Sequence, residues 1–248
     1  MPTDAYFQAI SSLSSLGPMR VWSLLVTVFG DLAPDRPLDG PTLSAIMGEI
    51  GIKPEASRVA LHRLRSDGWV GSEKQGRTSL HSLTPKGRSD SKAARARIYG
   101  QPREAEALMI LTSAPVELDQ TQFAQIAPRV FLCGPSASIP LDAIGLAPQS
   151  LPKWLGAQIE TEAMRDAYKS LHAVLTDIAE ELEDGLTAVQ TAALRVLIVH
   201  GWRRLTLKHP DLPRAAHSSD WRGHDCRALV SHLLTRFARP DLDAIKAT

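Results

Sequence analysis

Apolar side chains recur at helical spacing near the start of the chain, and this pattern predicts three helices. Residues 19–32 carry an apolar residue at every third or fourth position, as on the buried face of a helix. Pro41 and Pro54 each precede a further stretch of this kind, and proline is favoured in the first turn of a helix. A glycine follows each of these two stretches and can end the helix. We therefore expect three helices within residues 19–67.

Two short strand-like segments follow these helices and predict a β-hairpin. WVGS at 69–72 and TSLHSLT at 78–84 are separated by EKQGR, whose Gly76 can adopt the positive φ that a tight turn requires. Three helices followed by a hairpin are typical of a winged helix-turn-helix, in which the third helix enters the major groove of DNA. The pattern therefore predicts a winged helix-turn-helix domain at residues 1–98.

The next part of the chain is less regular. Residues 105–112 and 129–133 have the composition of strands, and loop-rich segments surround them. We expect a small central α/β module, ferredoxin-like or reduced, at residues 99–158.

Helical periodicity returns in the last part of the chain. From residue 160 onward apolar positions again step by three and four, which is typical of an amphipathic helix. The expected helices are 161–182, 187–207 and 224–238. The fold class expected for the whole chain is α+β, with residues 159–248 as a helical domain for ligand sensing and dimerisation.

The charge of the chain is unevenly distributed. The 248 residues are 44% apolar and have a net charge of +1, which favours a folded protein without a strong overall field. Residues 53–97, however, hold 11 basic and 4 acidic side chains, whereas both flanking segments are acidic. A local excess of this size is what attraction to nucleic-acid phosphates requires, although a solvated helix face can carry a similar charge.

Potential hydrogen-bond donors lie on one face of the expected third helix. Arg58, His62 and Arg65 are spaced i, i+4 and i+7, opposite the apolar Ala60 and Leu64. Arginine can bond guanine through two hydrogen bonds in the major groove, and histidine can donate or accept there. The two preceding helices and the hairpin favour this functional interpretation over an ordinary solvated face.

Three further basic residues are candidates for contacts with the DNA backbone. Arg63 lies further round the third helix, and Lys74 and Arg77 lie at the hairpin tip, where they could also serve only to keep the tip soluble. The complete set of expected DNA-binding residues is Arg58, His62, Arg63, Arg65, Lys74 and Arg77.

Several stretches of the chain resemble the PaaX family of transcriptional repressors. They are RVWSLLVTVFGDLA, GIKPEASRVALHRLRSDGWV, RTSLHSLT with the following Gly87 and Arg88, and LIVHGWRRLTLKHPDLP with SSDWRG. The resemblance implies a winged helix that binds operator DNA as a dimer and is released by an aromatic acyl-coenzyme A thioester, phenylacetyl-coenzyme A. Gly201 and Trp202 stand where the family usually has an acidic and an aromatic residue, so a different acyl-coenzyme A or an aromatic acid remains an open alternative.

A cluster in the C-terminal part could bind such an effector. Cations can meet the phosphates of coenzyme A, and an aromatic face can pack on an acyl ring. The expected ligand-binding residues are Trp202, Arg203, Arg204 and Lys208. The alternative is a surface-charged helix with Trp202 in the core, in which case we expect the effector pocket between the central module and the C-terminal helices.

No catalytic motif is present in the sequence. We find no G-x-S-x-G elbow, P-loop, glycine-rich dinucleotide turn or HExxH. The group formed by His217, Asp220, His224, Asp225 and Cys226 matches no zinc-ligand spacing. We therefore expect no enzyme activity, cofactor or metal, and the alternatives left open are a winged-helix adaptor for another protein and a hydrolase with an unrecognised site.

The remaining expectations concern location and assembly. The longest apolar run falls well short of a membrane span, no secretory leader opens the chain, and Cys133 and Cys226 lie far apart. These features predict a cytoplasmic protein without a membrane partner. Because a two-fold dimer reads two half-sites, we expect a homodimer on double-stranded operator DNA, with helix 161–182 as its candidate interface.

Overall fold

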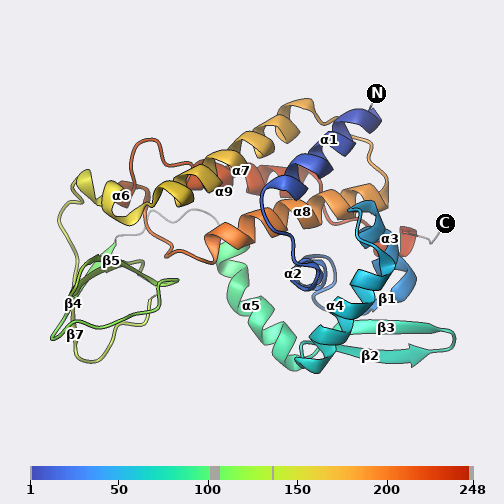
Figure 1. Cartoon of the computed structure of the whole chain (residues 1–248), viewed down its shortest axis with the longest axis horizontal. Helices are drawn as coiled ribbons and strands as arrows, with labels where there is room; N and C mark the ends of the chain where they lie inside the picture. Colours follow the sequence, from blue (N-terminus) through green and yellow to red (C-terminus); the bar gives the residue numbers. More distant parts are fainter. Residues whose placement is uncertain (1, 101–106, 136, 246–248) are drawn as a thin grey trace. The chain divides into compact units, whose positions relative to one another are not determined.

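The computed structural model describes residues 2–100, 107–135 and 137–245. The chain divides into two compact units, which we call the first and the second unit (Figure 1). The first unit comprises residues 1–96, 173–201 and 229–248, and the second comprises residues 97–172 and 202–228. The three-domain division at 1–98, 99–158 and 159–248 stays a prediction.

The N-terminal part of the first unit contains the three expected helices. They are preceded by a helix that the pattern did not predict, α1, and their bounds are α1 Pro2–Ser15, α2 Val21–Thr27 continued by a π-helical turn Val28–Leu32, α3 Gly40–Glu49 and α4 Pro54–Ser66. The carboxylate of Asp39 caps α3 by accepting a hydrogen bond from the Thr42 backbone N–H at 2.6 Å. Gly51 and Gly68 follow α3 and α4 with φ of +84° and +66°, a conformation that favours glycine.

A small antiparallel sheet follows these helices. Its strands are β1 Leu38–Asp39, β2 Val70–Gln75 and β3 Thr78–Leu83, in the order β1-β3-β2. The expected hairpin is confirmed, since Gln75 pairs with Thr78 and Gly76 turns the chain with φ of +60°. Helix α5, Pro85–Tyr99, leaves the hairpin.

Buried apolar side chains hold the helices of the first unit together. Helix α2 packs against α4 and α3 packs against α4, which puts the predicted apolar stripes inside. The largest fully buried side chains from this part of the chain are Tyr6, Leu24, Leu25, Phe29, Ile46 and Met47. Their burial removes the apolar faces of α1, α2 and α3 from water, and Ala60 and Leu64 do the same for α4.

The expected C-terminal helices are also present. Their bounds are α7 Glu162–Glu181, α8 Ala188–Thr206 and α9 Gly223–Arg236, and a short 3-10 turn, Leu242–Ala244, follows them. The apolar stripe of α7 is buried within the single chain, with exposures of 4% or less at Tyr168, Leu171, Leu175, Ile178 and Leu182. This stripe is therefore core of the chain and is not open to a second copy.

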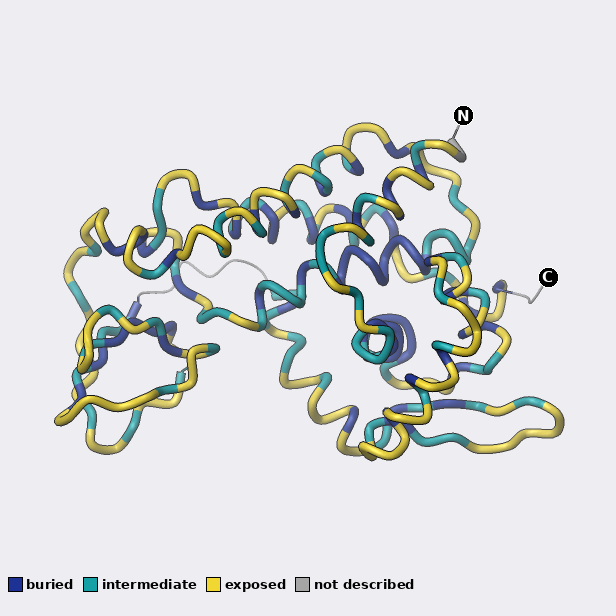
Figure 2. The backbone as a smooth tube through the Cα atoms, in the orientation of Figure 1, coloured by how far each residue is buried: buried dark blue, intermediate teal, exposed yellow. Residues whose placement is uncertain are grey.

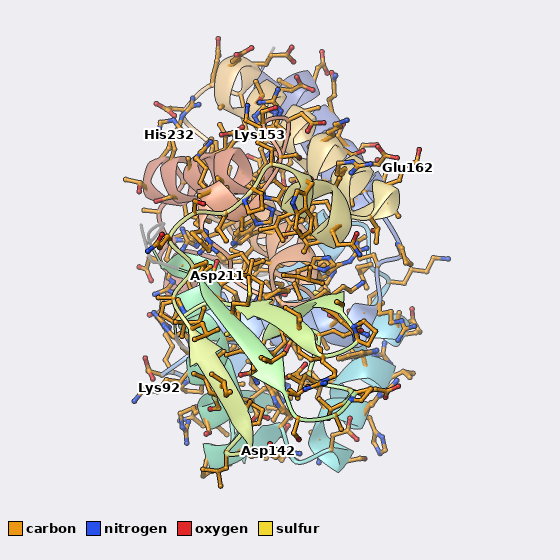
Figure 3. The ribbon with its side chains drawn as sticks, turned by 90° about the vertical axis from the view of Figure 1, so that its left-hand side faces the viewer. Lys92, Asp142, Lys153, Glu162, Asp211 and His232 are labelled. Atoms are coloured by element: carbon orange, nitrogen blue, oxygen red, sulfur yellow. The ribbon has the colours of Figure 1, made fainter. Side chains whose placement is uncertain are left out.

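The second unit is built on a four-stranded antiparallel sheet of order β5-β6-β4-β7. Its strands are β4 Leu108–Thr112, β5 Phe123–Ala127, β6 Val130–Cys133 and β7 Ala143–Leu146, and a short helix, α6 Trp154–Ile159, follows. Figure 3 faces this sheet and shows Asp142 at one end of it and Asp211 at the other. Strands β4 and β6 agree with the expected ones, although residues 105 and 106 lie outside the described residues, whereas β5 and β7 were missed.

The central module differs from one of its two expected forms. A ferredoxin-like unit has helices between its strands, and the described residues from β4 to β7 contain none. The reduced alternative is therefore the better description. Taken together, the two small antiparallel sheets and the helical C-terminal part make the chain an α+β protein, and no helix in the described part of the chain is long and apolar enough to cross a membrane.

Candidate functional site

Helix α4 presents the expected basic residues to solvent. Arg58, His62 and Arg65 are exposed, while Ala60 and Leu64 on the opposite face are buried. The helix begins at Pro54, whose fixed φ suits the first turn, and its apolar side packs on α2. The amphipathic pattern therefore orients the helix, with its basic face outward.

The arginines of this helix differ in how firmly they are held. Arg58 lies 3.2 Å from the carboxylate of Glu55, with both side chains more than 70% exposed. The guanidinium of Arg63 lies 5.1 Å from the ring centroid of Trp22 on α2, and its Nε is 3.8 Å from Asp67. Exposed ion pairs contribute little stability, so Arg58 can exchange Glu55 for an external partner at small cost, whereas Arg63 is positioned by packing.

A buried histidine links the two strands of the hairpin. His81 on β3 makes a 2.7 Å hydrogen bond to the Ser72 hydroxyl across the strand pair. Burial lowers the pKa of His81, and the nearby charge of Arg65 lowers it further against the opposing effect of Asp39. The lowered pKa favours the neutral imidazole of His81 at physiological pH.

The hairpin tip carries two exposed cations. Lys74 is in β2 and Arg77 is in the turn, and Figure 2 shows the end of the hairpin in the colour of exposed residues. Neither side chain forms an ion pair with another residue in the described part of the chain, and the backbone that presents them is set by the β2–β3 register. The tip is thus an exposed, positively charged end of the hairpin.

Sequence reasoning missed the residues that fix the start of the hairpin and α5. The Thr84 hydroxyl donates to the Gly68 carbonyl oxygen at 2.7 Å, and the Trp69 indole N–H donates to Asp90 at 3.1 Å. A Cβ at Gly87 would lie 2.3 Å from the Trp69 carbonyl oxygen, so this position requires glycine. Gly87 was noted only as part of the family resemblance, because close backbone approaches leave no periodic signal.

The expected ligand-binding cluster is not gathered around one cavity. Trp202 is 2% exposed, its indole N–H donates to the Ile98 carbonyl oxygen at 2.9 Å, and the Arg227 guanidinium lies 5.3 Å from its ring centroid. Arg203 is half-buried, and the part of its surroundings that excludes water lowers its pKa. Arg204 is half-buried and Lys208 is exposed. The Trp202 ring is thus part of the core of the second unit, and the ligand role of this cluster stays a prediction.

A cleft of about 680 Å³ lies in the second unit. It is lined by residues of β5 and β6, of the start of α7, and of the loop after α8. Its wall is mixed: Leu118, Ile159 and Met164 supply apolar surface, and polar side chains, among them Glu117 and Lys208, supply about as much of the lining. Phe123 and Phe131 lie behind this wall and are buried. A cleft of this volume is typical of small-molecule sites.

Two histidines on the wall of this cleft are neutral at physiological pH. Burial lowers the pKa of His209 and of His217. His217 donates through Nδ1 to the buried carboxylate of Glu160 at 3.0 Å, and its ring stacks on Trp221 with centroids 4.6 Å apart. The carboxylate of Glu160 also accepts a hydrogen bond from the Ser218 backbone N–H at 2.9 Å. This network fixes the wall of the cleft. Among the described residues after α8 that line the cleft, Lys208 is the one that carries a positive charge.

Arg97 and Arg227 hold the loop that lines the cleft. Arg97 donates to the carbonyl oxygens of Thr206 and His209. Arg227 forms a 2.7 Å ion pair with Asp211. Both arginines therefore position the segment that carries Lys208 and were not among the residues expected from sequence.

Nothing in the described residues forms a metal site or a reactive thiol site. No group of three or more potential metal ligands gathers among them. Cys133 and Cys226 are buried as free thiols, and burial raises the pKa of both, that of Cys226 to about 12. Thiols with such pKa values are protonated and poor nucleophiles at neutral pH.

Comparisons with known proteins cover most of the chain. Residues 20–87 match a family model described as PaaX-like protein, and residues 159–245 match one described as PaaX-like protein C-terminal domain. The transcriptional repressor PaaX of Escherichia coli is 26% identical over 258 residues, which cover 89% of this chain and 81% of that protein. Among solved structures, the uncharacterized protein Rv0674 from Mycobacterium tuberculosis has the same fold, with a TM-score of 0.57 and 18% sequence identity over 90% of this chain and 97% of that one.

Proposed function

The chain belongs to the PaaX-like protein family, and from this premise we propose that it is a transcriptional repressor that binds operator DNA and is released by a small-molecule effector. It is a regulator and not an enzyme, in keeping with its similarity to the repressor PaaX along most of its length. Its place of action is the cytoplasm, where bacterial operator DNA is found.

The observation that carries the proposal is the exposed basic face of α4 beside a hairpin with a basic tip. Helices α2, α3 and α4 followed by β2 and β3 have the order of a winged helix-turn-helix. In this arrangement α4 is the recognition helix, and Arg58, His62 and Arg65 reach base edges in the major groove. Arg63, Lys74 and Arg77 meet phosphates, and β2 and β3 form the wing.

The charge distribution supports DNA as the partner. Residues 53–97 carry an excess of seven basic over acidic side chains, and they span α4, the hairpin and most of α5. Each phosphate that a cation neutralises releases counterions into solution, so binding should weaken steeply as salt rises. A protein-binding adaptor would not need this excess.

The repressor acts as a homodimer in this proposal. One winged helix contacts only a few base pairs, whereas two copies related by a two-fold axis contact two half-sites about one helical turn or a multiple of it apart. Because the apolar stripe of α7 is buried in one chain, the dimer contact uses other surfaces.

The cleft in the second unit is the proposed effector site. Leu118, Ile159 and Met164 offer apolar surface for an aromatic acyl group, and Lys208 offers a cation for a carboxylate or a phosphate. An acyl-coenzyme A such as phenylacetyl-coenzyme A supplies an aromatic acyl group and phosphates. A free aromatic acid supplies an aromatic ring and one carboxylate. Release requires that the effector bind the conformation that binds DNA less tightly than it binds the conformation that does not.

DNA binding and effector response can be tested in one series. Duplexes selected from a random library by the full-length protein are titrated by fluorescence anisotropy at several salt concentrations, with and without phenylacetyl-coenzyme A or phenylacetate. We expect steep salt dependence, a sequence preference and weaker DNA binding in the presence of one of the two ligands. Absence of salt-dependent binding to any duplex would favour the adaptor alternative.

A further inference from the structure

One apolar side chain lies on the exposed side of α4, between His62 and Arg63 around the helix. Val59 is 72% exposed, the largest exposure of any large apolar side chain described on a helix. Its neighbours one turn away along the helix are Glu55, His62 and Arg63, all of which are exposed. Arg58 and Arg65 lie on one flank of this line, and the buried Ala60 faces the other way.

A single exposed valine on a protein surface needs no explanation by itself. The position of Val59 is what matters, because it lies beside His62 on the outward side of α4, and the outward side of a recognition helix enters the major groove. A side chain there meets the edges of base pairs, and valine can neither donate nor accept a hydrogen bond. It would leave a polar base edge without a partner, which is unfavourable.

Of the four bases, thymine alone presents an apolar group in the major groove, its 5-methyl group. We propose that Val59 contacts this methyl group and makes the protein select a thymine within each operator half-site. This inference rests on the proposed DNA-binding function, and it adds a specificity-determining residue to the polar ones expected from sequence.

The polar neighbours of Val59 fit such a contact. Arg63 is held toward Trp22 and Asp67 at the side of the helix, and Arg58 is paired with Glu55. The contact with Trp22 keeps the Arg63 guanidinium at the side of the helix, so the base pair opposite Val59 is met by the valine. Base pairs on either side remain within reach of Arg58 and His62.

The test combines a change in the protein with a matched change in the DNA. Full-length protein first selects duplexes from a random library, and each thymine of the tightest duplex is then replaced by deoxyuridine, which differs only by lacking the 5-methyl group. Dissociation constants are measured for the native chain and for Val59→Ala. Val116→Ala, which alters another exposed valine outside α4, is the control.

We expect one thymine per half-site whose replacement weakens binding of the native chain about three- to fivefold, the effect of burying one methyl group. Val59→Ala should bind the thymine duplex about as weakly as the native chain binds the deoxyuridine duplex, and should no longer distinguish the two. This coupling isolates the contact, as in a double-mutant cycle. Val116→Ala should retain the full distinction.

Two results would overturn the inference in distinguishable ways. If the native chain binds selected duplexes but tolerates deoxyuridine at every position, or if Val59→Ala keeps the native ratio between the two duplexes, Val59 does not read thymine while the DNA-binding function stands. If no duplex is selected at all, the proposed function fails together with this inference. Thermal unfolding of Val59→Ala confirms that the variant is folded, which its exposure leads us to expect.

Discussion

Arg195 on α8 forms a buried, two-pronged ion pair with Asp31, 164 positions earlier in the chain. Its Nε and Nη2 donate to the two carboxylate oxygens at 2.7 and 3.1 Å, and its Nη1 donates to the carbonyl oxygens of Leu234 and Phe237 at 2.9 Å each. All these residues belong to the first unit. The pair therefore fastens the helices next to α4 to the C-terminal helices of the same unit.

Removing one partner of this pair should strongly destabilise the fold. Asp31→Ala leaves the buried charge of Arg195 without its counterion, and breaking a buried pair in this way typically costs about 3–5 kcal/mol. Urea unfolding followed by circular dichroism measures the change. Asp243→Ala is the matched control, because its pair with Arg36 is exposed and should contribute less than about 1 kcal/mol. Equal effects of the two substitutions would show that the buried pair has no special role.

The basic face of α4 should contribute sequence-specific affinity. Arg58→Ala and His62→Ala are each expected to weaken binding to a selected duplex by about 1–3 kcal/mol, the range of a good base contact. Binding to random DNA should change less, and Lys153→Ala, an exposed cation far along the sequence, should change neither. Equal losses on selected and random DNA would assign these side chains to phosphates.

The hairpin tip should contribute affinity without specificity. Replacing Lys74 or Arg77 by glutamine removes a cation and leaves the β2–β3 register in place. Each lost phosphate contact should reduce the slope of log K against log salt by about one unit. The measurement is a salt titration of binding to selected and to random duplexes. An unchanged slope would remove the wing from the DNA interface.

Two locations for the effector can be separated by substitution. If the cleft is the site, Lys208→Gln should weaken ligand-induced release about tenfold or more, as expected for loss of a charge-assisted hydrogen bond. If the cluster expected from sequence is the site, Arg203→Gln with Arg204→Gln should abolish release while operator binding remains intact. The effector concentration that releases half of the DNA is measured for each variant. A normal response from all of them would place the sensor elsewhere.

The histidines of the second unit should make stability depend on pH. Burial lowers the pKa of His224 to about 4 and lowers that of His217, so the folded protein holds fewer protons than the unfolded chain below pH 6.5. The free energy of unfolding should therefore be fully maintained above pH 6.5 and should fall as pH drops from 6.5 toward 4. His224→Asn should reduce this fall, whereas His232→Asn, at an exposed position, should not. Urea unfolding at constant ionic strength provides the measurement.

Local pattern was sufficient to predict the parts of the fold that local forces specify. The helices of residues 19–67, the hairpin turn at Gly76 and the three C-terminal helices were predicted from periodicity, proline and glycine, because each depends on neighbours within a few positions. The outward basic face of α4 followed from the same periodicity. Strands β5 and β7 are as short as β4 and β6 but were missed, because FAQIA and AIGL contain alanine, glutamine or glycine in place of the continuous apolar runs LMIL and VFLC.

The sequence by itself therefore determined the α4 face, the hairpin and the family resemblance, whereas tertiary structure decided which groups in the C-terminal part meet. Sequence placed Trp202 beside three cations as an expected ligand-binding residue. Only the tertiary structure shows that its ring is buried and that its indole N–H donates to the Ile98 carbonyl oxygen. The cleft at Lys208 and the pairing of Asp31 with Arg195 join residues distant in sequence. Burial and ion pairing depend on which elements pack together in space, and periodicity along the chain records only which face of each element is apolar.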